Sequence, residues 1–454
     1  MSVDFKQKVL LDQNYLKDLA SKALDCAKKL GACECEISLS SLEGISISTR
    51  SGDVENIEFN KDRSMDICVY KDNRQGVAST SDFTDGAIDK TVRAALDIAN
   101  YTDKDPVSYV IEKQYLSSTQ YDFENTFDIE RDTDSAVDKA IALEREYLDN
   151  TVKNIKKSDG ASLSSTLITK VEANSNGFIG AKSKSSNSRS ISLLGERNGK
   201  MQTGYGFSVN CNPKLLYSNK DIVDEAIEKT LNKLDATSIK TGKYNVIFKD
   251  SAAMFIWSTL TKAIRGGLLY KDSSFLCNSI DKKIFNDYVS LIEDPFVKGS
   301  GLSSNFDGEG AQVYKNSIIE DGILNMYLLG SYSARKLKLK PNGHASYIGT
   351  LFPKFDKAHT CTFDDMLKDV SEGIVITSLM GQGVNITNGD VSRGASGYYF
   401  KDGKRVHALE EITVAFNLKD LFLKLAMMSN DDIDERYSIK TGSILVENVT
   451  ISGI

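Results

Sequence analysis

The first half of the chain contains four stretches in which apolar residues recur at helical spacing. These stretches are residues 16–32, 84–101, 132–149 and 221–234. Gly31 lies where the first helix can end with a left-handed residue, and Thr84 is a suitable N-cap for the second. We therefore expect four helices in this half.

Between these stretches the pattern changes to alternation of apolar and polar residues. In residues 34–80, alternating Ile and Val with turns at 43–44, 51–53 and 72–73 predict an antiparallel meander of about four strands. Residues 161–210 are rich in Ser, Thr, Asn and Gly and contain short β-like runs. Their low hydrophobicity predicts a sheet with one face in water.

Strand patterns dominate from residue 243 onward, with hairpin turns expected at Asp321-Gly322 and Asp402-Gly403. No βα alternation is long enough for a doubly wound fold. We predict an α+β fold with an N-terminal helix/antiparallel-sheet domain and a β-rich C-terminal domain. The expected parts are residues 1–110, 111–235 and 236–454, the first two being blocks of the N-terminal domain.

Composition narrows the functional classes. The 454 residues carry a net charge of −7 without a basic tract, which disfavours direct nucleic-acid binding. The N-terminus lacks the apolar segment of a signal peptide, and no run of about 18 apolar residues predicts a membrane span. Seven scattered cysteines without a CxxC pair indicate reduced thiols. We expect a cytoplasmic protein.

The chain contains three histidines, His344, His359 and His407, and neither HExxH nor HExxxH occurs. His407 lies in RVHALEEITVAF, whose alternation predicts a strand. On a strand, His407 and Glu410 point to opposite faces, so they cannot bind the same metal ion. The Gly-rich segments 298–310 and 381–390 match no phosphate-loop motif. No GxSxG elbow is present, and a Ser/His/Asp triad stays open.

Residues 246–265, VIFKDSAAMFIWSTLTKAIR, predict a strand followed by a helix that holds the only tryptophan. Asp250 and Ser251 can cap this helix, and no ionisable residue occurs from 251 to 261. A helix that is apolar on most sides is normally packed in a core or an interface, which we expect here rather than direct chemistry.

Four segments resemble the TldD/PmbA family, also called modulators of DNA gyrase. They are residues 48–82, 328–345, 379–404 and 411–422. The order SYSARKL, GHA and GQGVNITNGDVSRGASGYY resembles the PmbA branch, also named TldE. The resemblance implies a two-part α+β fold and a cytoplasmic complex in which PmbA pairs with a TldD subunit to form a metal-dependent peptidase.

In the TldD branch, the zinc ligands come from an HExxxH helix and a cysteine near the C-terminus. An ungapped alignment from residues 266–276 puts WSTLTK, residues 257–262, at the HExxxH positions. Trp257 and Lys262 then replace the histidines, and the terminal segment 438–445 has no cysteine. Indole offers no available lone pair and lysine is protonated near neutral pH. We therefore expect no metal or other cofactor in this chain and zinc in a TldD-type partner.

Three hypotheses follow from the resemblance and the residues. The first is a non-catalytic subunit that pairs with a TldD-type zinc subunit and helps enclose unfolded peptides. The second is a regulatory protein that acts on DNA gyrase. The third and weaker one is a stand-alone metal hydrolase that uses His344 or His359 with carboxylates. Self-association of the isolated chain as a homodimer stays open.

Four residues are candidates for contacts with a peptide or a partner. Arg393 lies among small residues, which suits recognition of a carboxylate or carbonyl, although a structural salt bridge is equally consistent. His344, Asn385 and Glu411 lie in segments that resemble the family. For His344, a plain surface or loop histidine is the alternative.

Overall fold

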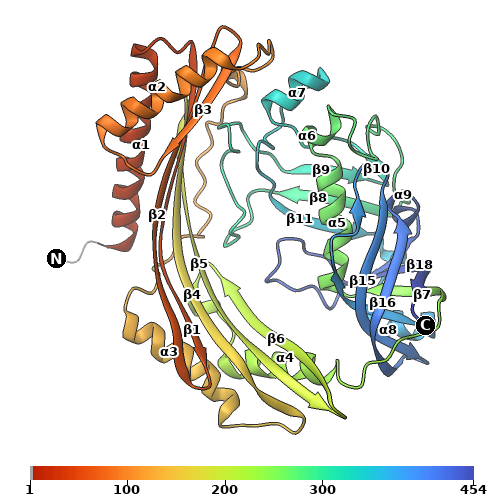
Figure 1. Cartoon of the computed structure of the whole chain (residues 1–454). Helices are drawn as coiled ribbons and strands as arrows, with labels where there is room; N and C mark the ends of the chain where they lie inside the picture. The colour runs from red at the N-terminus through yellow and green to blue at the C-terminus, as the bar shows by residue number, and fades with distance from the viewer. Residues whose placement is uncertain (1–3) are drawn as a thin grey trace.

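One six-stranded antiparallel sheet organises the first half of the chain in the computed structural model, which describes residues 4–454 (Figure 1). Its strand order is β3-β2-β1-β4-β5-β6, so both blocks expected in the N-terminal domain contribute to one sheet. The elements of this lobe are α1 (Phe5–Lys29), β1 (Glu34–Arg50), β2 (Asp53–Lys71), β3 (Arg74–Thr80), α2 (Asp85–Tyr101), η1 (Lys113–Tyr115), α3 (Thr133–Leu148), β4 (Ile155–Asn174), β5 (Ile179–Arg197), β6 (Lys200–Asn210), η2 (Pro213–Leu215) and α4 (Asn219–Leu231).

The four predicted helices are confirmed, with shifted ends. α1 begins at Phe5 rather than near residue 16, and Gly31 follows its end with φ of 92°. The hydroxyl of Thr84 accepts a hydrogen bond from the Ala87 amide, as an N-cap does. The helices pack on one face of the sheet, where strand residues such as Ile37, Ile47 and Ile191 are buried.

The expected turn at Glu43-Gly44 is wrong, because β1 continues through it and the meander has three strands rather than four. Gly44 instead permits close approach of β4. A Cβ atom at Gly44 would lie 2.5 Å from the carbonyl oxygen of Ser165. The other two turns occur where predicted, with positive φ at Ser51 and Gly52 and at Asp72 and Asn73.

The second half of the chain forms a β-rich lobe. Its elements are β7 (Gly242–Phe248), α5 (Asp250–Ala263), α6 (Gly266–Leu269), β8 (Val289–Asp294), β9 (Asn316–Glu320), β10 (Ile323–Leu324), α7 (Ser331–Leu337), β11 (Thr350–Phe355), η3 (Lys357–His359), β12 (Thr360–Cys361), α8 (Phe363–Val370), β13 (Glu372–Met380), β14 (Val384–Asn385), β15 (Asp390–Lys401), β16 (Lys404–Asn417), α9 (Leu418–Phe422), β17 (Leu425–Ser429) and β18 (Ile444–Ser452). The predicted α+β class is therefore confirmed.

Two sheets build this lobe. The larger has the order β12-β17-β18-β16-β15-β13-β7, and it closes on itself because β7 also pairs with β18. The smaller has the order β10-β9-β8-β11. Both predicted hairpin turns are confirmed, since Asp321-Gly322 joins β9 to β10 and Asp402-Gly403 joins β15 to β16 with positive φ at all four residues.

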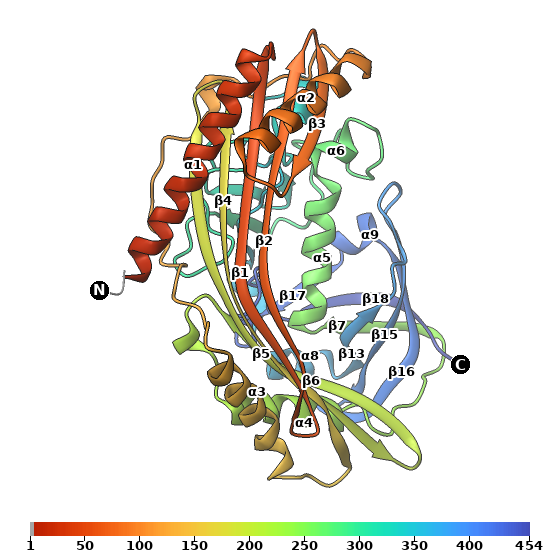
Figure 2. The same ribbon diagram turned by 60° about the vertical axis from the view of Figure 1, so that its left-hand side comes forward.

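The expected cap of α5 is wrong. Lys249 is the N-cap residue and no side chain caps the helix, while the Ser251 hydroxyl donates to the Thr377 carbonyl at 3.4 Å. The burial is as predicted for most of the helix, because Ala253, Ile256 and Trp257 are wholly inaccessible to solvent. α5 lies on the side of the C-terminal lobe that faces the six-stranded sheet (Figure 2).

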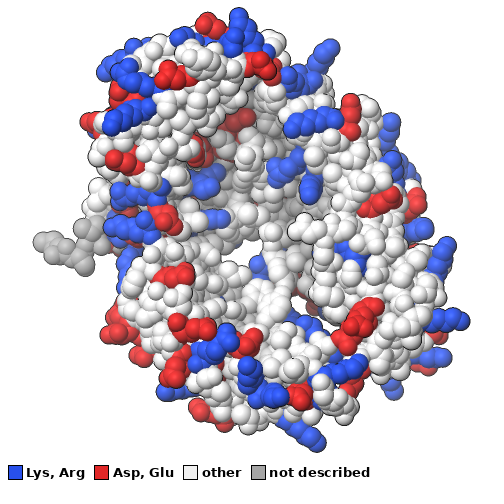
Figure 3. Space-filling model, viewed as in Figure 1, with Lys and Arg blue, Asp and Glu red and all other residues white. Residues whose placement is uncertain are grey.

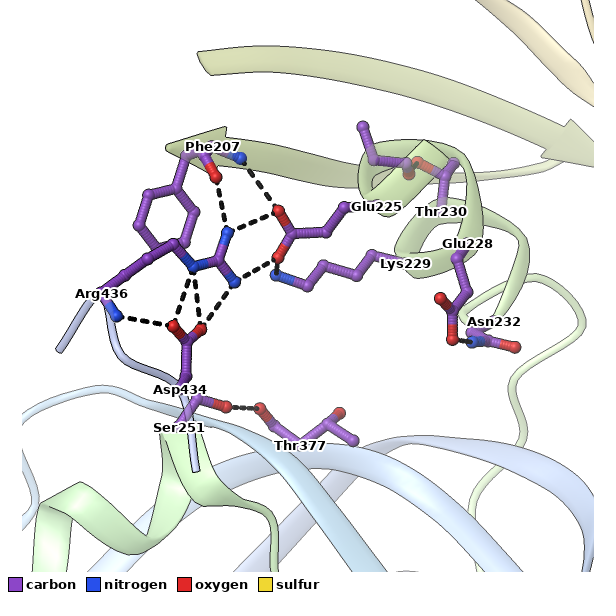
Figure 4. A network of polar contacts seen from close by, with 11 residues as sticks. Phe207, Glu225, Glu228, Lys229, Thr230, Asn232, Ser251, Thr377, Asp434 and Arg436 are labelled. Atoms are coloured by element: carbon purple, nitrogen blue, oxygen red, sulfur yellow. Dashed lines mark hydrogen bonds and ion pairs between the residues drawn. The ribbon is translucent and has the colours of Figure 1, made fainter. Parts of the chain in front are cut away.

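Arginines connect the two lobes. The Arg436 guanidinium binds Glu225 of α4 through two contacts of 2.8 Å and also binds Asp434 beside it (Figure 4). Arg335 of α7 donates to the carbonyls of Tyr109 and Val110 at 2.7 and 3.1 Å. These contacts fix the hollow between the lobes.

No helix within residues 4–454 is both long enough and apolar enough to cross a membrane.

Candidate functional site

Helix α5 and the C-terminal segment 438–443 meet in the core of the second lobe. The indole Nε1 of Trp257 donates a hydrogen bond to the Thr441 hydroxyl oxygen at 3.1 Å, and both residues are buried. The Trp257 ring also stacks on Phe285 with centroids 5.7 Å apart. The two segments that the resemblance associates with zinc ligands are thus adjacent, and an indole–hydroxyl contact lies between them.

The remaining positions of WSTLTK point elsewhere. Ser258 and Lys262 are exposed, whereas Trp257 is wholly buried. Trp257 therefore points into the core of the lobe, whereas Lys262 lies on the solvent side of the helix. The exposed side of α5 carries a hydroxyl and an ammonium rather than imidazoles.

These residues do not fit a zinc site. The Trp257 nitrogen is a donor that is already bonded to Thr441, and neither indole nor a protonated amine can ligate zinc. Within residues 4–454, no group of three or more His, Cys, Asp or Glu side chains is arranged to hold a metal ion. All seven cysteines are free thiols, as the sequence indicates.

His344 is buried in a polar network of the C-terminal lobe. Its Nε2 lies 2.8 Å from Glu293 Oε2, and its Nδ1 lies 2.8 Å from Asn342 Oδ1. The Asn342 amide donates to the Tyr327 carbonyl and its Oδ1 accepts from the Leu329 amide, so Oδ1 must be an acceptor for the ring. Both ring nitrogens therefore lie within hydrogen-bond distance of acceptor oxygens.

Glu293 is the charged partner in this network. Burial alone would raise its pKa, but the His344 contact, the Gly349 amide at 2.6 Å and the Asn316 amide at 2.9 Å lower the pKa below its ordinary value. Both side chains are about 1% exposed. The geometry gives His344 a structural role in connecting β8 to the 342–349 loop.

The other two histidines, His359 and His407, each lie beside a tyrosine ring. His359 stacks on Tyr288 with centroids 3.6 Å apart, and its Nδ1 lies 2.7 Å from Asp356 Oδ1. His407 lies beside Tyr399, with centroids 5.4 Å apart.

Arg393 of β15 packs against α5. Its guanidinium carbon lies 4.9 Å from the centroid of the Phe255 ring, and it donates to the carbonyls of Leu379 and Met380 at 3.2 and 3.3 Å. It forms no ion pair within residues 4–454. Arg393 thus binds carbonyls, as its setting suggested, but they belong to the end of β13 in this chain.

Asn385 and Glu411 occupy exposed backbone irregularities. The Asn385 side chain accepts from the Thr387 amide at 3.0 Å and shapes the turn between β14 and β15. Glu411 has φ of 54° and lies in a bulge of β16. No hydrogen bond or ion pair joins any two of the four sequence candidates, all of which lie in the described chain.

The inner face of the six-stranded sheet is lined by hydroxyls. Alternate positions of β1, β4 and β5 that face the second lobe are serines, namely Ser38, Ser40, Ser46, Ser48, Ser162, Ser164, Ser186, Ser188 and Ser190. Several pair across strands, for example Ser46 with Ser164 at 3.0 Å. Uncharged side chains dominate the hollow between the lobes (Figure 3).

A cavity lies where the two lobes meet, and no pattern in the sequence predicts it. This seam cavity of about 820 Å³ lies between the 177–184 end of β5, the loop 117–126 and the loop 301–306. Lys17, Lys170, Lys182 and Lys184 line it, whereas Asp122 is the one acidic residue among its lining. No sequence motif could reveal it, because its walls come from segments far apart in the chain.

Carboxyl groups also gather where the lobes meet. Removal from water raises the pKa of Glu36 to about 7 and that of Glu309 to about 8, and Asp307 and Glu36 further raise the latter. Asp307 is wholly buried and accepts from the amides of Glu309, Ala311 and Ala345, each at 2.9 Å. Burial where the lobes meet thus favours the neutral form of the Glu36 and Glu309 carboxyls.

Comparison with known protein families matches three successive segments of the chain. Residues 35–99 match the PmbA/TldA metallopeptidase domain 1, residues 128–234 the central domain and residues 241–453 the C-terminal domain. Together these segments cover most of the chain.

Individual relatives are similar over nearly their whole length. Metalloprotease PmbA of Escherichia coli O157:H7 is 37% identical over 440 residues, with 96% of each chain covered. The metalloprotease PmbA homolog of Haemophilus influenzae is 35% identical over 438 residues, again with 96% of each chain covered.

Solved structures share the fold. One from Bacteroides thetaiotaomicron, named as a modulator of DNA gyrase, has a TM-score of 0.89 at 24% identity and covers 96% of this chain and 99% of its own. TldE from Thermococcus kodakarensis has a TM-score of 0.78 at 18% identity and covers 96% of this chain and 100% of its own. At these identities the likeness shows the fold alone.

Proposed function

Because the chain belongs to the TldD/PmbA family of metallopeptidases, we propose that it is a non-catalytic subunit of the PmbA/TldE type. In this proposal it pairs in the cytoplasm with a TldD-type subunit, which binds the zinc. The complex degrades or processes unfolded peptides. The zinc would supply a nucleophilic water there, and this chain contributes no metal ligand.

The contact between Trp257 and Thr441 carries the proposal. The helix and the C-terminal segment are adjacent, but in place of metal ligands the Trp257 indole and the Thr441 hydroxyl form a buried hydrogen bond of 3.1 Å. A buried donor and acceptor that satisfy each other have no free lone pair for a metal. The metalloprotease names of the relatives therefore suit a complex in which another chain holds the zinc.

The inner face of the sheet supports the assignment of an unfolded substrate. Serine hydroxyls present donors and acceptors without charge, so they favour no particular peptide side chain. The inner face of the six-stranded sheet, on which these serines lie, is turned toward α5 (Figure 1). A wall of this kind suits a chamber that accepts many extended sequences.

Reconstitution with a TldD-type subunit tests the proposal. Zinc content and hydrolysis of a flexible peptide are measured for this chain alone, for the partner alone and for the mixture. We expect stoichiometric zinc only in samples that contain the partner and full hydrolysis only in the mixture. Replacing the HExxxH glutamate of the partner by glutamine should abolish hydrolysis, whereas Ser258→Ala in this chain should not.

Two results would contradict the proposal. Stoichiometric zinc in the isolated chain with peptide hydrolysis would support a stand-alone metallopeptidase. Failure of the two chains to associate under gentle conditions would remove the proposed role. A change in the supercoiling activity of DNA gyrase caused by the purified chain would support the regulatory alternative. The net charge of −7 disfavours direct contact of this chain with DNA.

A further inference from the structure

The end of β5 has an unpaired edge. β6 pairs only with residues 187–197 of β5, so residues 179–183 have a neighbouring strand on the β4 side alone. The Ser185 amide donates to the Asn125 carbonyl, and the Ser183 carbonyl accepts from the Thr126 hydroxyl. Odd-numbered residues thus point their backbone groups away from β4, and those of Ile179 and Ala181 have no hydrogen-bond partner within residues 4–454.

The loop that could cover this edge is held away from it. Its residue Tyr121 exchanges hydrogen bonds with the Asn305 side chain at 2.9 and 3.1 Å, and Ser117 donates to the Asn305 carbonyl. The Phe123 carbonyl accepts from the Gly299 amide at 2.7 Å. These contacts anchor residues 117–123 to the C-terminal lobe, so the space beside the β5 edge is the seam cavity.

The lysines of the seam cavity are not engaged in ion pairs within residues 4–454, although most other regions of this acidic chain are rich in such pairs. These lysines are Lys17, Lys170, Lys182 and Lys184. Lys184 donates to the Gly301 carbonyl at 3.0 Å, and Lys182 donates to the Ser304 hydroxyl at 3.1 Å. Lys170 is exposed.

From this edge and these lysines, we propose that the seam cavity binds an acidic peptide segment in extended conformation. The peptide adds a short strand beside residues 179–183 and hydrogen-bonds to the free backbone groups of β5. Five residues in a strand span roughly 17 Å. Carboxylates of the peptide lie near Lys170 and Lys184, which share the inner face of β4 and β5 and are diagonal to each other, since Lys170 pairs with Lys182 and Lys184 with Ile168.

The charges around the cavity favour carboxylates over ammonium groups. Lys182 lies near Glu172 and Asp307, and burial lowers the pKa of its ammonium group below the ordinary value. Glu172 is largely removed from water, which raises the pKa of its carboxyl above the ordinary value. Lys170 and Lys184 therefore give the open part of the cavity a positive potential.

Peptide binding to the purified chain alone tests this site independently of the peptidase role. Fluorescence anisotropy is recorded with three labelled hexapeptides of equal length. One contains alternating Asp or Glu residues, the second carries Lys at the same positions, and the third is the acidic peptide with N-methylated backbone amides. We expect saturable binding of the first, at least tenfold weaker binding of the other two, and weaker binding at higher salt.

Charge reversal locates the site. Lys170→Glu is expected to weaken binding of the acidic peptide about tenfold or more, because an attraction becomes a repulsion. Lys157→Glu is the matched control, since Lys157 is also an exposed lysine of β4 without an ion pair but lies outside the cavity. The affinity of the Lys157→Glu variant for the acidic peptide should stay within about twofold of the wild-type affinity.

Several results would overturn the proposal. Absence of acidic-peptide binding at millimolar concentration would do so. Equal binding of the acidic and N-methylated peptides would exclude strand pairing and leave only a diffuse charge effect. Equal affinities of the Lys170→Glu and Lys157→Glu variants would place binding elsewhere.

Discussion

The indole nitrogen of Trp257 and the hydroxyl oxygen of Thr441 lie 3.1 Å apart across a gap of 184 residues in sequence. This contact joins the start of the C-terminal lobe to its end, because α5 follows β7, the first strand of the lobe, and Thr441 precedes β18, the last strand. A zinc site at this place would use the same two segments. In this chain, packing and one hydrogen bond hold the two segments together.

Loss of this hydrogen bond should reduce stability. Trp257→Phe keeps the stacking on Phe285 but removes the N–H donor, and we expect the free energy of unfolding to fall by about 2–3 kcal/mol. Thr441→Val should cost about 1–3 kcal/mol, because it leaves the indole donor buried without a partner. Urea unfolding followed by far-UV circular dichroism measures both variants.

The double variant provides the control for this pair. Its loss should be smaller than the sum of the two single losses by about 1 kcal/mol, since the second change removes a group that the first has already orphaned. Strict additivity would show that the two residues act separately.

Local patterns predicted much of the fold. Helix spacing located α1 to α4, and the Asp-Gly dipeptides located two hairpins, because both signals depend on neighbouring residues. The Glu43-Gly44 turn failed for a tertiary reason. Gly44 is needed where β4 approaches the strand, and nothing near it in sequence distinguishes this use from a turn.

The site was less predictable than the fold. The absence of HExxxH could be read directly, but the partner of Trp257 could not, because Thr441 is distant in sequence. Arg393 was expected to meet a carboxylate or carbonyl, and only the structure identifies the end of β13 and Phe255 as its contacts. The seam cavity depends on how two lobes meet, which single-sequence patterns do not encode.

Removal of His344 should destabilise the C-terminal lobe. His344→Ala leaves the buried Glu293 carboxylate without its imidazole partner, and we expect a loss of about 3–5 kcal/mol in the free energy of unfolding. His407→Ala is the control, with an expected change of less than about 1 kcal/mol, because His407 is partly exposed. Similar denaturation midpoints for the two variants would contradict the structural role of His344.

The Arg436 contacts predict that the lobes loosen when this guanidinium is changed. Arg436→Lys cannot bind Glu225 and Asp434 bidentately at once, so we expect a loss of about 2–4 kcal/mol and faster proteolysis between residues 430 and 441. Arg93→Lys is the matched control, because the Arg93–Asp89 pair is exposed on α2. Identical cleavage patterns would show that the interlobe pairs contribute little.

Neutralising Glu309 should change how stability depends on pH. The folded state holds the pKa of this carboxyl at about 8, above its ordinary value of 4.5, because it is largely removed from water near Asp307 and Glu36. Between these two values the unfolded chain releases a proton that the folded chain retains, so the wild type loses stability as pH rises. Glu309→Gln removes this loss and keeps an acceptor for the Ser331 amide, so it should exceed the wild type by about 2 kcal/mol at pH 9 and match it near pH 4. Glu58→Gln on the exposed part of β2 is the control for loss of a charge. Parallel profiles of stability against pH for the wild type and Glu309→Gln would contradict the raised pKa of Glu309.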